Sequence, residues 1–335
     1  MKYKLDEKNG LKIMDEFAII NSYFTGLGPD LPEVLEAQGD DCALLQIKPG
    51  ELLALSVDTS VVDRHFPAQA DPWAIGWRCL AIALSDLAAM AARPLGFTLA
   101  ITLPEAEDAW LAEFSRGMRA LADKAACPLI GGDTTRGSLS MSVQVHGAVK
   151  SQHHWRRSGA RPGQIIVLLG NLGLAHLGLL AMQADPTKAQ DRQTWNRAEQ
   201  AYMLPEPLVT EALRLAQGVK IHAAIDVSDG LLADLQHLLA SSAVGAKIDL
   251  NRLPVQAELK EKLGAEAALQ ATLQGGDDYA LLMTLEEKDF ELARSLCPNL
   301  VSIGECVAGA GIRTLEGKVL DPQGFNHFLP QAFNE

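Results

Sequence analysis

The sequence predicts a two-domain α/β protein. Strand-like and helix-like segments alternate along most of the chain, which is the pattern of domains that stack helices on a β-sheet. The stretch RSGARPGQ at 157–164 is rich in glycine and arginine and follows a predicted strand, so it marks the expected domain boundary. We therefore expect an N-terminal domain over residues 14–149 and a C-terminal domain over residues 150–335.

Length and composition agree with this prediction. A chain of 335 residues is long enough for two domains that each bury a core. Its 48% hydrophobic and 21% charged residues are ordinary for a soluble globular protein. The formal net charge of −13 argues against nucleic acid or a membrane surface as a partner, because both attract basic faces.

The cysteines and the N-terminal segment favour a cytoplasmic protein. The five cysteines are odd in number and contain no C-x-x-C pair, so we expect reduced, mostly buried thiols rather than a disulfide framework or a zinc site. The first residues lack the apolar core of a signal peptide, and no apolar stretch of about 18 residues follows. Residues 1–13 are polar and without pattern, so we expect no fold element there, and Met14 is a candidate for the natural start.

In the N-terminal domain, a buried strand is expected to lead into a long helix. The run ELLALSVDTSV at 51–61 is typical of a buried strand, and residues 71–92 are strongly helical until Pro94 ends the helix. The later segments are predicted as a strand at 95–103, an amphipathic helix at 107–126, a strand at 128–131 and an alternating strand at 139–149.

The C-terminal domain is predicted to repeat this alternation. Its strands are expected at 165–169, 221–226, 246–250, 279–285 and 301–307. Its helices are expected at 173–184, 189–202, 207–217, 230–241 and 286–297.

Aspartates recur where predicted strands end. The carboxylates in question are Asp41, Asp58, Asp133, Asp226 and Asp229, together with Asp86 in the helix at 71–92. Short loops after strands are the places where α/β folds build sites. If these carboxylates converge, their repulsion calls for divalent cations, and Mg²⁺ typically combines one or two carboxylates with waters and phosphate oxygens.

Two stretches sharpen this expectation. Asp86 lies in CLAIALSDLAAMAA, where an ionised and unpartnered carboxylate would cost several kcal/mol, so it needs a metal or an ion pair with Arg78 or Arg93. In LIGGDTTRGS at 129–138, the glycines suit close approach of the backbone to a phosphate, but Asp133 would repel that phosphate unless a metal lay between them.

Seven motifs in the same order resemble the thiamine-monophosphate kinase family. They are GDDCALL (39–45), SVDTSVVDRHF (56–66), LSDLAAMAARP (84–94), LIGGDTTRG (129–137), RSGARPGQ (157–164), IDVSDGL (225–231) and GGDDYAL (275–281). The resemblance runs from about residue 16 to about residue 328. It implies the two-domain α/β (α+β) fold shared with aminoimidazole ribonucleotide synthetase and selenophosphate synthetase, with an N-terminal domain that forms a homodimer and a C-terminal domain that completes the active-site cleft.

The resemblance also implies a role for particular residues. The implied metal ligands are Asp41, Ser56, Val57, Asp58, Asp86, Asp133, Asp226 and Asp229; the nucleotide contacts are Gly132, Arg157 and Ser228; the thiamine-phosphate contacts are His65, Asp277 and Phe325. Val57 stands where a threonine is common, so only its backbone oxygen could bind a metal. Asp277 replaces the usual glutamate, which is one methylene longer.

The implied reaction is ATP-dependent phosphorylation of thiamine monophosphate to thiamine diphosphate, the last step of thiamine diphosphate biosynthesis, by direct in-line transfer. Several Mg²⁺ ions and ATP as co-substrate are expected. No general base is expected, because the second pKa of an acceptor phosphate is about 6.

Other interpretations of these residues and of the whole chain stay open. The chain could be another enzyme of this fold, such as selenophosphate synthetase, or a non-catalytic cation- or nucleotide-binding protein. His65 could be a surface histidine, Phe325 a core aromatic residue, and Arg157 the partner of a surface acid.

Overall fold

The computed structural model describes residues 3–5 and 12–322, and the chain forms two compact units. The first unit comprises Met1–Leu87, Ala92–Gln152 and Asp185–Thr194, and the second comprises Ala88–Ala91, His153–Ala184 and Trp195–Glu335. None of the helices in these described ranges has the length and apolar character needed to cross a bilayer.

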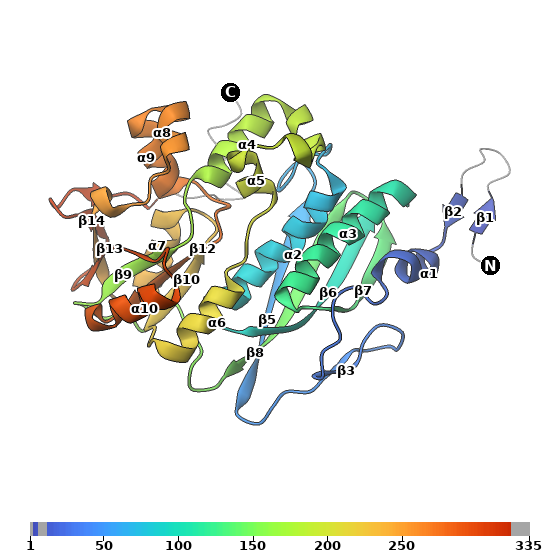
Figure 1. Ribbon diagram of the computed structural model, residues 1–335, viewed down its shortest axis with the longest axis horizontal. Helices are drawn as coiled ribbons and strands as arrows, with labels where there is room; N and C mark the ends of the chain where they lie inside the picture. The colour runs from blue at the N-terminus through green and yellow to red at the C-terminus, as the bar shows by residue number, and fades with distance from the viewer. Residues whose placement is uncertain (1–2, 6–11, 323–335) are drawn as a thin grey trace. The chain divides into compact units, whose positions relative to one another are not determined.

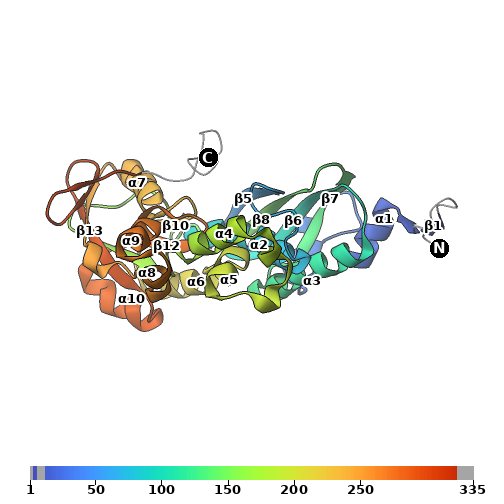
Figure 2. The same ribbon diagram turned by 90° about the horizontal axis from the view of Figure 1, so that it is seen from above.

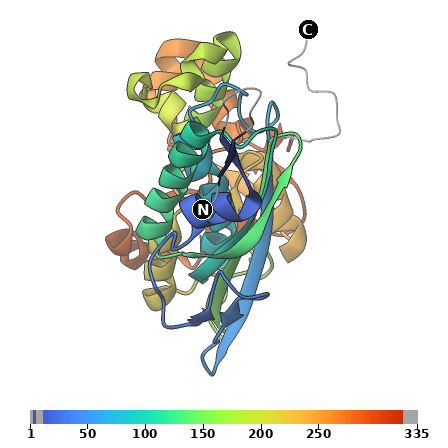
Figure 3. The ribbon, with the colours of Figure 1, turned by 90° about the vertical axis from the view of Figure 1, so that its right-hand side faces the viewer.

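The first unit contains a four-stranded sheet in the order β5-β8-β6-β7. Its strands are β5 (Glu51–Val61), β8 (Ser140–Lys150), β6 (Arg93–Leu103) and β7 (Leu129–Arg136). Strands β5 and β6 run antiparallel to β8, whereas β7 is parallel to β6. Two long helices, α2 (Pro72–Ala89) and α3 (Asp108–Ala125), lie on one face of this sheet (Figures 1 and 3).

The strand β5 has the predicted bounds, but it is not buried. Leu53, Leu55 and Val57 are 46%, 54% and 61% exposed. Alternate residues of a strand point to the same face, so these three side chains share one face of the sheet. Ser56 points to the other face, because its hydroxyl contacts Asp86 on α2. The apolar run therefore predicted a strand correctly, but it could not reveal that one face has no helix on it.

The segment GGDTTR does not form the loop that was predicted after residue 131. Strand β7 continues through it to Arg136, and its residues stay in parallel register with β6, with Asp133 opposite Ala100. The two threonines favour an extended backbone, and the neighbouring strand supplies hydrogen-bond partners. The glycines misled the prediction, since they serve strand packing and not a turn.

The N-terminal segment contains more structure than its composition predicted. Strand β1 (Tyr3–Leu5) pairs antiparallel with β2 (Lys12–Met14), where no element was expected. Helix α1 (Glu16–Ile19) follows and is capped by Asp15, whose carboxylate accepts a hydrogen bond from the amide of Ala18. It continues as a π-helical turn over Ile20–Phe24. A short antiparallel pair, β3 (Val34–Glu36) and β4 (Leu44–Leu45), then precedes the main sheet.

The second unit is built on a seven-stranded sheet in the order β10-β12-β9-β13-β11-β14-β15. Its strands are β9 (Ile165–Leu169), β10 (Ala223–Val227), β11 (Gly245–Ile248), β12 (Ala280–Leu285), β13 (Val301–Val307), β14 (Ile312–Thr314) and β15 (Val319–Leu320). All neighbours are antiparallel except β11 and β14. Figure 2 shows α7 (Leu231–Ser242) on one face of this sheet and α10 (Phe290–Leu296) on the other.

The remaining helices differ from the prediction in two places. They are α4 (Leu174–Ala184), α5 (Arg197–Met203), α6 (Val209–Gly218), α8 (Ala257–Leu263) and α9 (Ala265–Gln274). The helix predicted at 189–202 begins only at Arg197, because Asn196 caps it in a reciprocal capping box with Glu199. The sequence predicted neither α8 nor α9, whose 7 and 10 residues are separated by Gly264.

The cysteines are placed largely as predicted. Cys79, Cys127, Cys297 and Cys306 are buried thiols, and Cys42 is exposed. Burial raises the pKa of Cys79 and of Cys306 to about 12, so both thiols are protonated at neutral pH.

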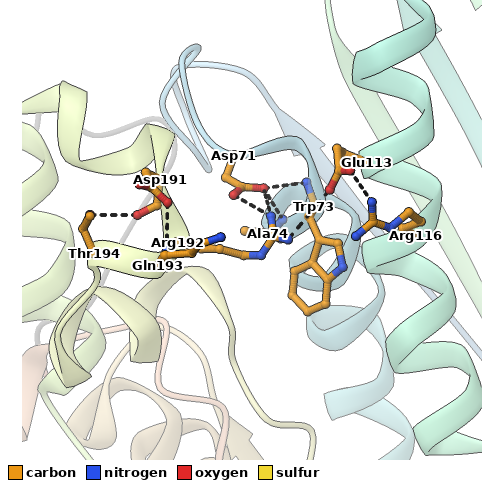
Figure 4. Close-up of polar contacts among 9 residues, drawn as sticks. All are labelled: Asp71, Trp73, Ala74, Glu113, Arg116, Asp191, Arg192, Gln193 and Thr194. Carbon is orange, nitrogen blue, oxygen red and sulfur yellow. Dashed lines mark hydrogen bonds and ion pairs between the residues drawn. The ribbon is translucent and has the colours of Figure 1, made fainter.

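A buried carboxylate fixes the start of α2 and holds the segment 185–194 on the first unit (Figure 4). The Oδ1 atom of Asp71 accepts hydrogen bonds from the amides of Trp73 at 2.9 Å and Ala74 at 3.4 Å, which caps the helix. The Nη1 atom of Arg192 lies 3.0 Å from Oδ1 and 2.7 Å from Oδ2 of the same carboxylate. The guanidinium group also lies over the ring of Trp73, 4.9 Å from its centroid.

Replacing Asp71 should destabilise the protein strongly. Asp71→Ala removes a helix cap and leaves Arg192 with only Glu113, whose Oε2 atom lies 3.8 Å from Nη2, so we expect the free energy of unfolding to fall by about 2 kcal/mol in urea denaturation. The control is Arg116→Ala, which removes an exposed i,i+3 pair with Glu113 and should cost less than about 0.5 kcal/mol. Equal losses in the two variants would show that Asp71 does not anchor this segment.

Candidate functional site

In the first unit, three of the predicted ligands lie on the helix-covered side of the sheet. Asp86 lies on α2 and is partly exposed, and its Oδ2 atom accepts a short hydrogen bond from Ser56 Oγ on β5. Asp58 follows two residues later on the same strand face and is also partly exposed. Strand β5 and helix α2 thus bring together a hydroxyl and two carboxylates. All three groups are oxygen donors, as Mg²⁺ prefers.

The arginines proposed as alternative partners of Asp86 make other contacts. The Nη2 atom of Arg93 lies 3.3 Å from Glu33 and 3.5 Å from Glu51. The Nε atom of Arg78 donates to the carbonyl oxygen of His65 at 3.2 Å. Asp86 is also less enclosed than the apolar sequence around it suggested, since solvent reaches part of its side chain.

Asp133 lies on the opposite face of this sheet. It is in register with Ala100, which pairs with Ser142, and Ser142 pairs with Thr59, so these four residues form one row. The hydroxyls of Thr59 and Ser142 lie 2.8 Å apart in this row. Asp58 instead pairs with the buried Val143 in the adjacent row. The first unit alone therefore does not bring Asp133 beside Asp58.

Gly132 is required by the packing of β7 on β6. Its φ is +154°, and a Cβ atom added there would lie 1.9 Å from the carbonyl oxygen of Leu99, which is too close for any side chain. At Gly131 the nearest atom to an added Cβ would be Thr98 Cγ2 at 3.7 Å, an ordinary contact. The glycines were expected to let the backbone approach a phosphate closely. At Gly132 the backbone approaches the neighbouring strand β6 instead.

Three further predicted residues of the first unit lie outside this group. Asp41 is exposed between β3 and β4, and its amide donates to Asp40 Oδ1 at 2.8 Å. Val57 directs its side chain to the uncovered face of the sheet. His65 is half-buried, and its Nδ1 atom accepts a hydrogen bond from the amide of Val61 at 3.0 Å. Its Nε2 atom therefore carries the hydrogen in the neutral ring, which makes that edge a donor.

The second unit contains a separate acidic group at the turn between β10 and α7. Asp226 is the buried penultimate residue of β10, and Asp229 lies in the turn three residues later. Asp234, in the first turn of α7, is 4% exposed, and its Oδ2 atom accepts hydrogen bonds from the amides of Ser228 and Asp229, both at 3.0 Å. Burial, followed by the charges of Asp229 and Asp226, raises the pKa of Asp234 to about 7.

The loop that carries Asp277 is joined to this turn. The amide of Asp277 donates to the carbonyl oxygen of Ser228 at 2.8 Å, and the amide of Tyr279 donates to that of Val227 at 2.8 Å. Asp277 has a φ of 65°, a left-handed conformation that aspartate tolerates better than most residues. The hydroxyl of Tyr279 donates to its Oδ1 atom at 3.1 Å.

A cavity of about 660 Å³ lies next to this loop, within the size range of small-molecule sites. His176 and Leu180 of α4 form one side, and α9 with Gln270 and Gln274 forms another, ending at Gly275. Burial lowers the pKa of His176, although the charge of Asp277 partly offsets this effect. The cavity is therefore lined by small and apolar side chains together with polar ones, Glu266, Gln270 and Gln274, and its imidazole lies within the field of the Asp277 carboxylate.

Arg157 and Phe325 are the last two predicted residues of the second unit. Arg157 has an exposed side chain, while its carbonyl oxygen accepts a hydrogen bond from Ser242 Oγ at the end of α7. Phe325 lies outside the described residues.

Sequence reasoning missed Asp234 and Asp278. Asp278 accepts hydrogen bonds from the amides of Gly173 at 2.6 Å and Ala175 at 3.3 Å, which ties the start of β12 to the start of α4. Burial raises its pKa well above the usual range of a carboxyl group. The sequence could have indicated Asp234, because a carboxylate in the first turn of a predicted helix can accept hydrogen bonds from the free backbone amides at that end. No comparable signal existed for Asp278, whose partners lie about a hundred residues away in the sequence.

Within neither unit do the described carboxylates alone form a metal centre. In the ranges 3–5 and 12–322, no group of three or more His, Cys, Asp or Glu side chains is arranged to hold a metal ion. The donors nevertheless suit Mg²⁺, because each unit presents oxygen ligands. In the second unit burial, with the charges of Asp229 and Asp226 added to it, raises the pKa of Asp234, and a bound cation would offset those two charges.

Comparison with known proteins identifies relatives along nearly the whole chain. The N-terminal domain model of the AIR synthase related proteins matches residues 39–149, and the C-terminal domain model matches residues 161–314. The thiamine-monophosphate kinase of Escherichia coli strain K12 is 38% identical over 322 residues, which is 93% of this chain and 98% of the relative. These matches confirm the predicted two-domain fold class.

Solved structures give the same result. A crystal structure of thiamine-monophosphate kinase from Stenotrophomonas maltophilia K279a has a TM-score of 0.79 and 40% identity, covering 87% of this chain and 93% of that one. AaThiL complexed with AMPPCP and TMP has a TM-score of 0.74 and 26% identity, covering 84% and 89% of the two chains.

The two adjacent glycines of β7 should respond very differently to a methyl group. Gly132→Ala places Cβ against the Leu99 carbonyl and should lower the free energy of unfolding by about 2–3 kcal/mol in thermal or urea unfolding. Gly131→Ala meets only an ordinary contact and should change it by less than about 1 kcal/mol. A tolerated Gly132→Ala with wild-type stability would mean that the observed β6–β7 packing is wrong.

Proposed function

Because this chain belongs to the thiamine-monophosphate kinase family, we propose that it transfers the γ-phosphoryl group of ATP to thiamine monophosphate, giving ADP and thiamine diphosphate. The observation that carries this proposal is the 38% identity to the Escherichia coli enzyme over 98% of its length. The AaThiL complex with AMPPCP and TMP supports both substrates. The proposed reaction is the final step of thiamine diphosphate synthesis. Because it uses ATP, we place the protein in the cytoplasm.

We assign the binding of Mg²⁺ to the oxygen donors of both units. The ligands proposed are Ser56, Asp58, Asp86, Asp133 and Asp41 in the first unit, with the backbone oxygen of Val57, and Asp226 and Asp229 in the second. When bound, Mg²⁺ would offset the repulsion between the phosphates of the two substrates. The protein's own part is to hold these groups in place. Strand β5 and helix α2 position Ser56, Asp58 and Asp86, β7 positions Asp133, and β10 with the turn before α7 positions Asp226 and Asp229.

The remaining predicted residues are proposed to bind the two substrates. Gly132, Ser228 and the exposed guanidinium of Arg157 are assigned to the nucleotide. His65, with a hydrogen on Nε2, suits an acceptor group of thiamine monophosphate. Asp277 and Phe325 complete the assignment, and the cavity beside Asp277 supports it. No side chain is assigned as a general base, because the acceptor phosphate is already anionic at neutral pH.

We also propose that the N-terminal domain, residues 14–149, forms a homodimer. Leu53, Leu55 and Val57 expose an apolar stripe on the uncovered face of the sheet, a surface that a second copy of the chain would bury. Asp133 lies on the same face, so pairing there would also change its surroundings. The C-terminal domain, residues 150–335, is assigned the β10–α7 turn and the loop with Asp277.

ADP release measured in a coupled assay tests the proposed activity. We expect release with thiamine monophosphate and only background release without it or with selenide in its place. A cation- or nucleotide-binding protein would release no ADP in any arm. Selenide-dependent formation of AMP and inorganic phosphate, measured separately, would favour a selenophosphate synthetase.

Asp86→Asn should give a folded protein with low turnover. The amide keeps the shape and can still accept from Ser56, but it removes the charge assigned to the metal. We expect kcat to fall about 100-fold, the scale of losing one main electrostatic stabiliser. Asp123→Asn, at an exposed carboxylate of α3, is the control and should keep normal turnover. If both variants kept normal turnover, Asp86 would have only a structural role.

Asp277 should affect the Michaelis constant for one substrate only. Asp277→Gly deletes the carboxylate and accepts the φ of 65°, so it avoids the strain that alanine would introduce. Loss of a charged hydrogen bond should raise KM for thiamine monophosphate about 10-fold or more, and KM for ATP should be nearly unchanged. Asp277→Glu should remain active. The opposite pattern, with ATP affinity lost and thiamine monophosphate affinity kept, would contradict the assignment of Asp277.

A further inference from the structure

The turn between β10 and α7 is held through its backbone amides by one carboxylate. Ser228 and Asp229 both donate to the Oδ2 atom of Asp234, each at 3.0 Å. Asp234 is 4% exposed and projects from the first turn of α7. A single buried oxygen atom therefore determines the direction of two consecutive peptide groups.

The carbonyl groups of the same turn are held from the other side. The amides of Asp277 and Tyr279 donate to the carbonyl oxygens of Ser228 and Val227, each at 2.8 Å. A Cβ atom on Gly276 would lie 2.6 Å from the Ser228 oxygen, so no other residue allows this approach. The turn therefore has both its donors and its acceptors committed within the second unit, and its conformation is closely determined.

From this geometry we propose that Asp234 is a positioning residue: it orients Asp226, Ser228 and Asp229 for Mg²⁺ and nucleotide by holding the turn's amides. Asp234 itself is not assigned as a ligand, because one of its oxygens already accepts two amides and the side chain is almost fully enclosed. Replacing a residue that orients metal ligands through hydrogen bonds commonly changes the affinity for the metal.

The proposal rests on the proposed function for its metal and nucleotide part, but the hydrogen bonds can be tested without either. Asp234→Ala removes the acceptor. Asp234→Asn keeps an oxygen that can accept from both amides, and its NH₂ group would face the carboxylates of Asp229 and Asp226, whose charges act on this position. The two variants therefore separate hydrogen bonding from charge.

A matched control is available in the same unit. The Oδ1 atom of Asp249 accepts a hydrogen bond from the amide of Asn251 at 3.0 Å, in a short turn that contains no residue of the proposed site. Asp249→Ala should reproduce the loss of a carboxylate–amide contact without affecting the turn before α7.

The first measurement is amide hydrogen exchange of the full-length protein without nucleotide or metal. We expect Asp234→Ala to speed exchange at Ser228 and Asp229 about tenfold or more, because both amides lose their acceptor, and Asp234→Asn to leave exchange near wild type. The Asp249 variant should change exchange only near Asn251. Unchanged exchange in Asp234→Ala would overturn the proposal whether or not the chain is a kinase.

The second measurement is the Mg²⁺ concentration that gives half-maximal ADP release. It should rise about 10- to 100-fold in Asp234→Ala, and KM for thiamine monophosphate should change much less. Asp234→Asn and Asp249→Ala should stay near wild type. If Asp234→Asn were as impaired as Asp234→Ala while its exchange stayed normal, the charge of Asp234 would be required and the positioning role would be wrong. A wild-type chain without kinase activity would instead reject the proposed function and leave the exchange result standing.

Discussion

Crowded carboxylates are the constraint on which the proposed site depends. Where β10 turns into α7, three aspartates lie close enough that burial and the charges of Asp229 and Asp226 raise the pKa of Asp234 to about 7. A fold maintains such an arrangement only if donors compensate for the repulsion. Here the donors are two backbone amides at Asp234 and, in the other unit, the hydroxyl of Ser56 at Asp86. A divalent cation would supply the remaining compensation in a chain whose net charge is −13.

The architecture of each unit explains why these carboxylates stay in place. Ser56 and Asp58 lie within an 11-residue strand that is paired along its whole length with β8, and Asp86 faces them from α2. Asp226 lies next to the end of β10, which pairs with β12 over its whole length. Apart from Asp41, which is exposed between β3 and β4, the proposed ligands are therefore on paired strands, on α2 or on a turn fixed at both its amides and its carbonyls. Such preorganisation is what catalysis by positioning and electrostatics requires.

Periodicity predicted the long elements well, and local chemistry explains where it failed. The strand 51–61 and the helices near 71–92 and 107–126 follow from apolar spacing, which tertiary packing did not override. The glycines at 131 and 132 suggested a loop, although a neighbouring strand can require glycine just as strictly as a turn does. The helix predicted from residue 189 begins late, because Asn196 caps it.

The candidate site could be predicted only in part. Aspartates at strand ends were visible in the sequence, as were the motifs that carry the resemblance. Strand register determines the face of the sheet to which each carboxylate points. The sequence alone therefore could not show that Asp133 and Asp58 lie on opposite faces. Asp278 could not be found from its surroundings either, because its partners Gly173 and Ala175 are distant in sequence.

Calorimetry of nucleotide binding tests the central claim, that these acidic groups bind polyphosphate only through a divalent cation. A non-hydrolysable ATP analogue should be titrated into the wild-type protein with Mg²⁺ and, separately, with excess chelator. We expect measurable binding with Mg²⁺ and a loss of about 100-fold or more in affinity without it, since the uncompensated carboxylates would repel the phosphates. Equal affinity in the two titrations would show that the nucleotide is held by other groups, and the metal assignment of these aspartates would be wrong.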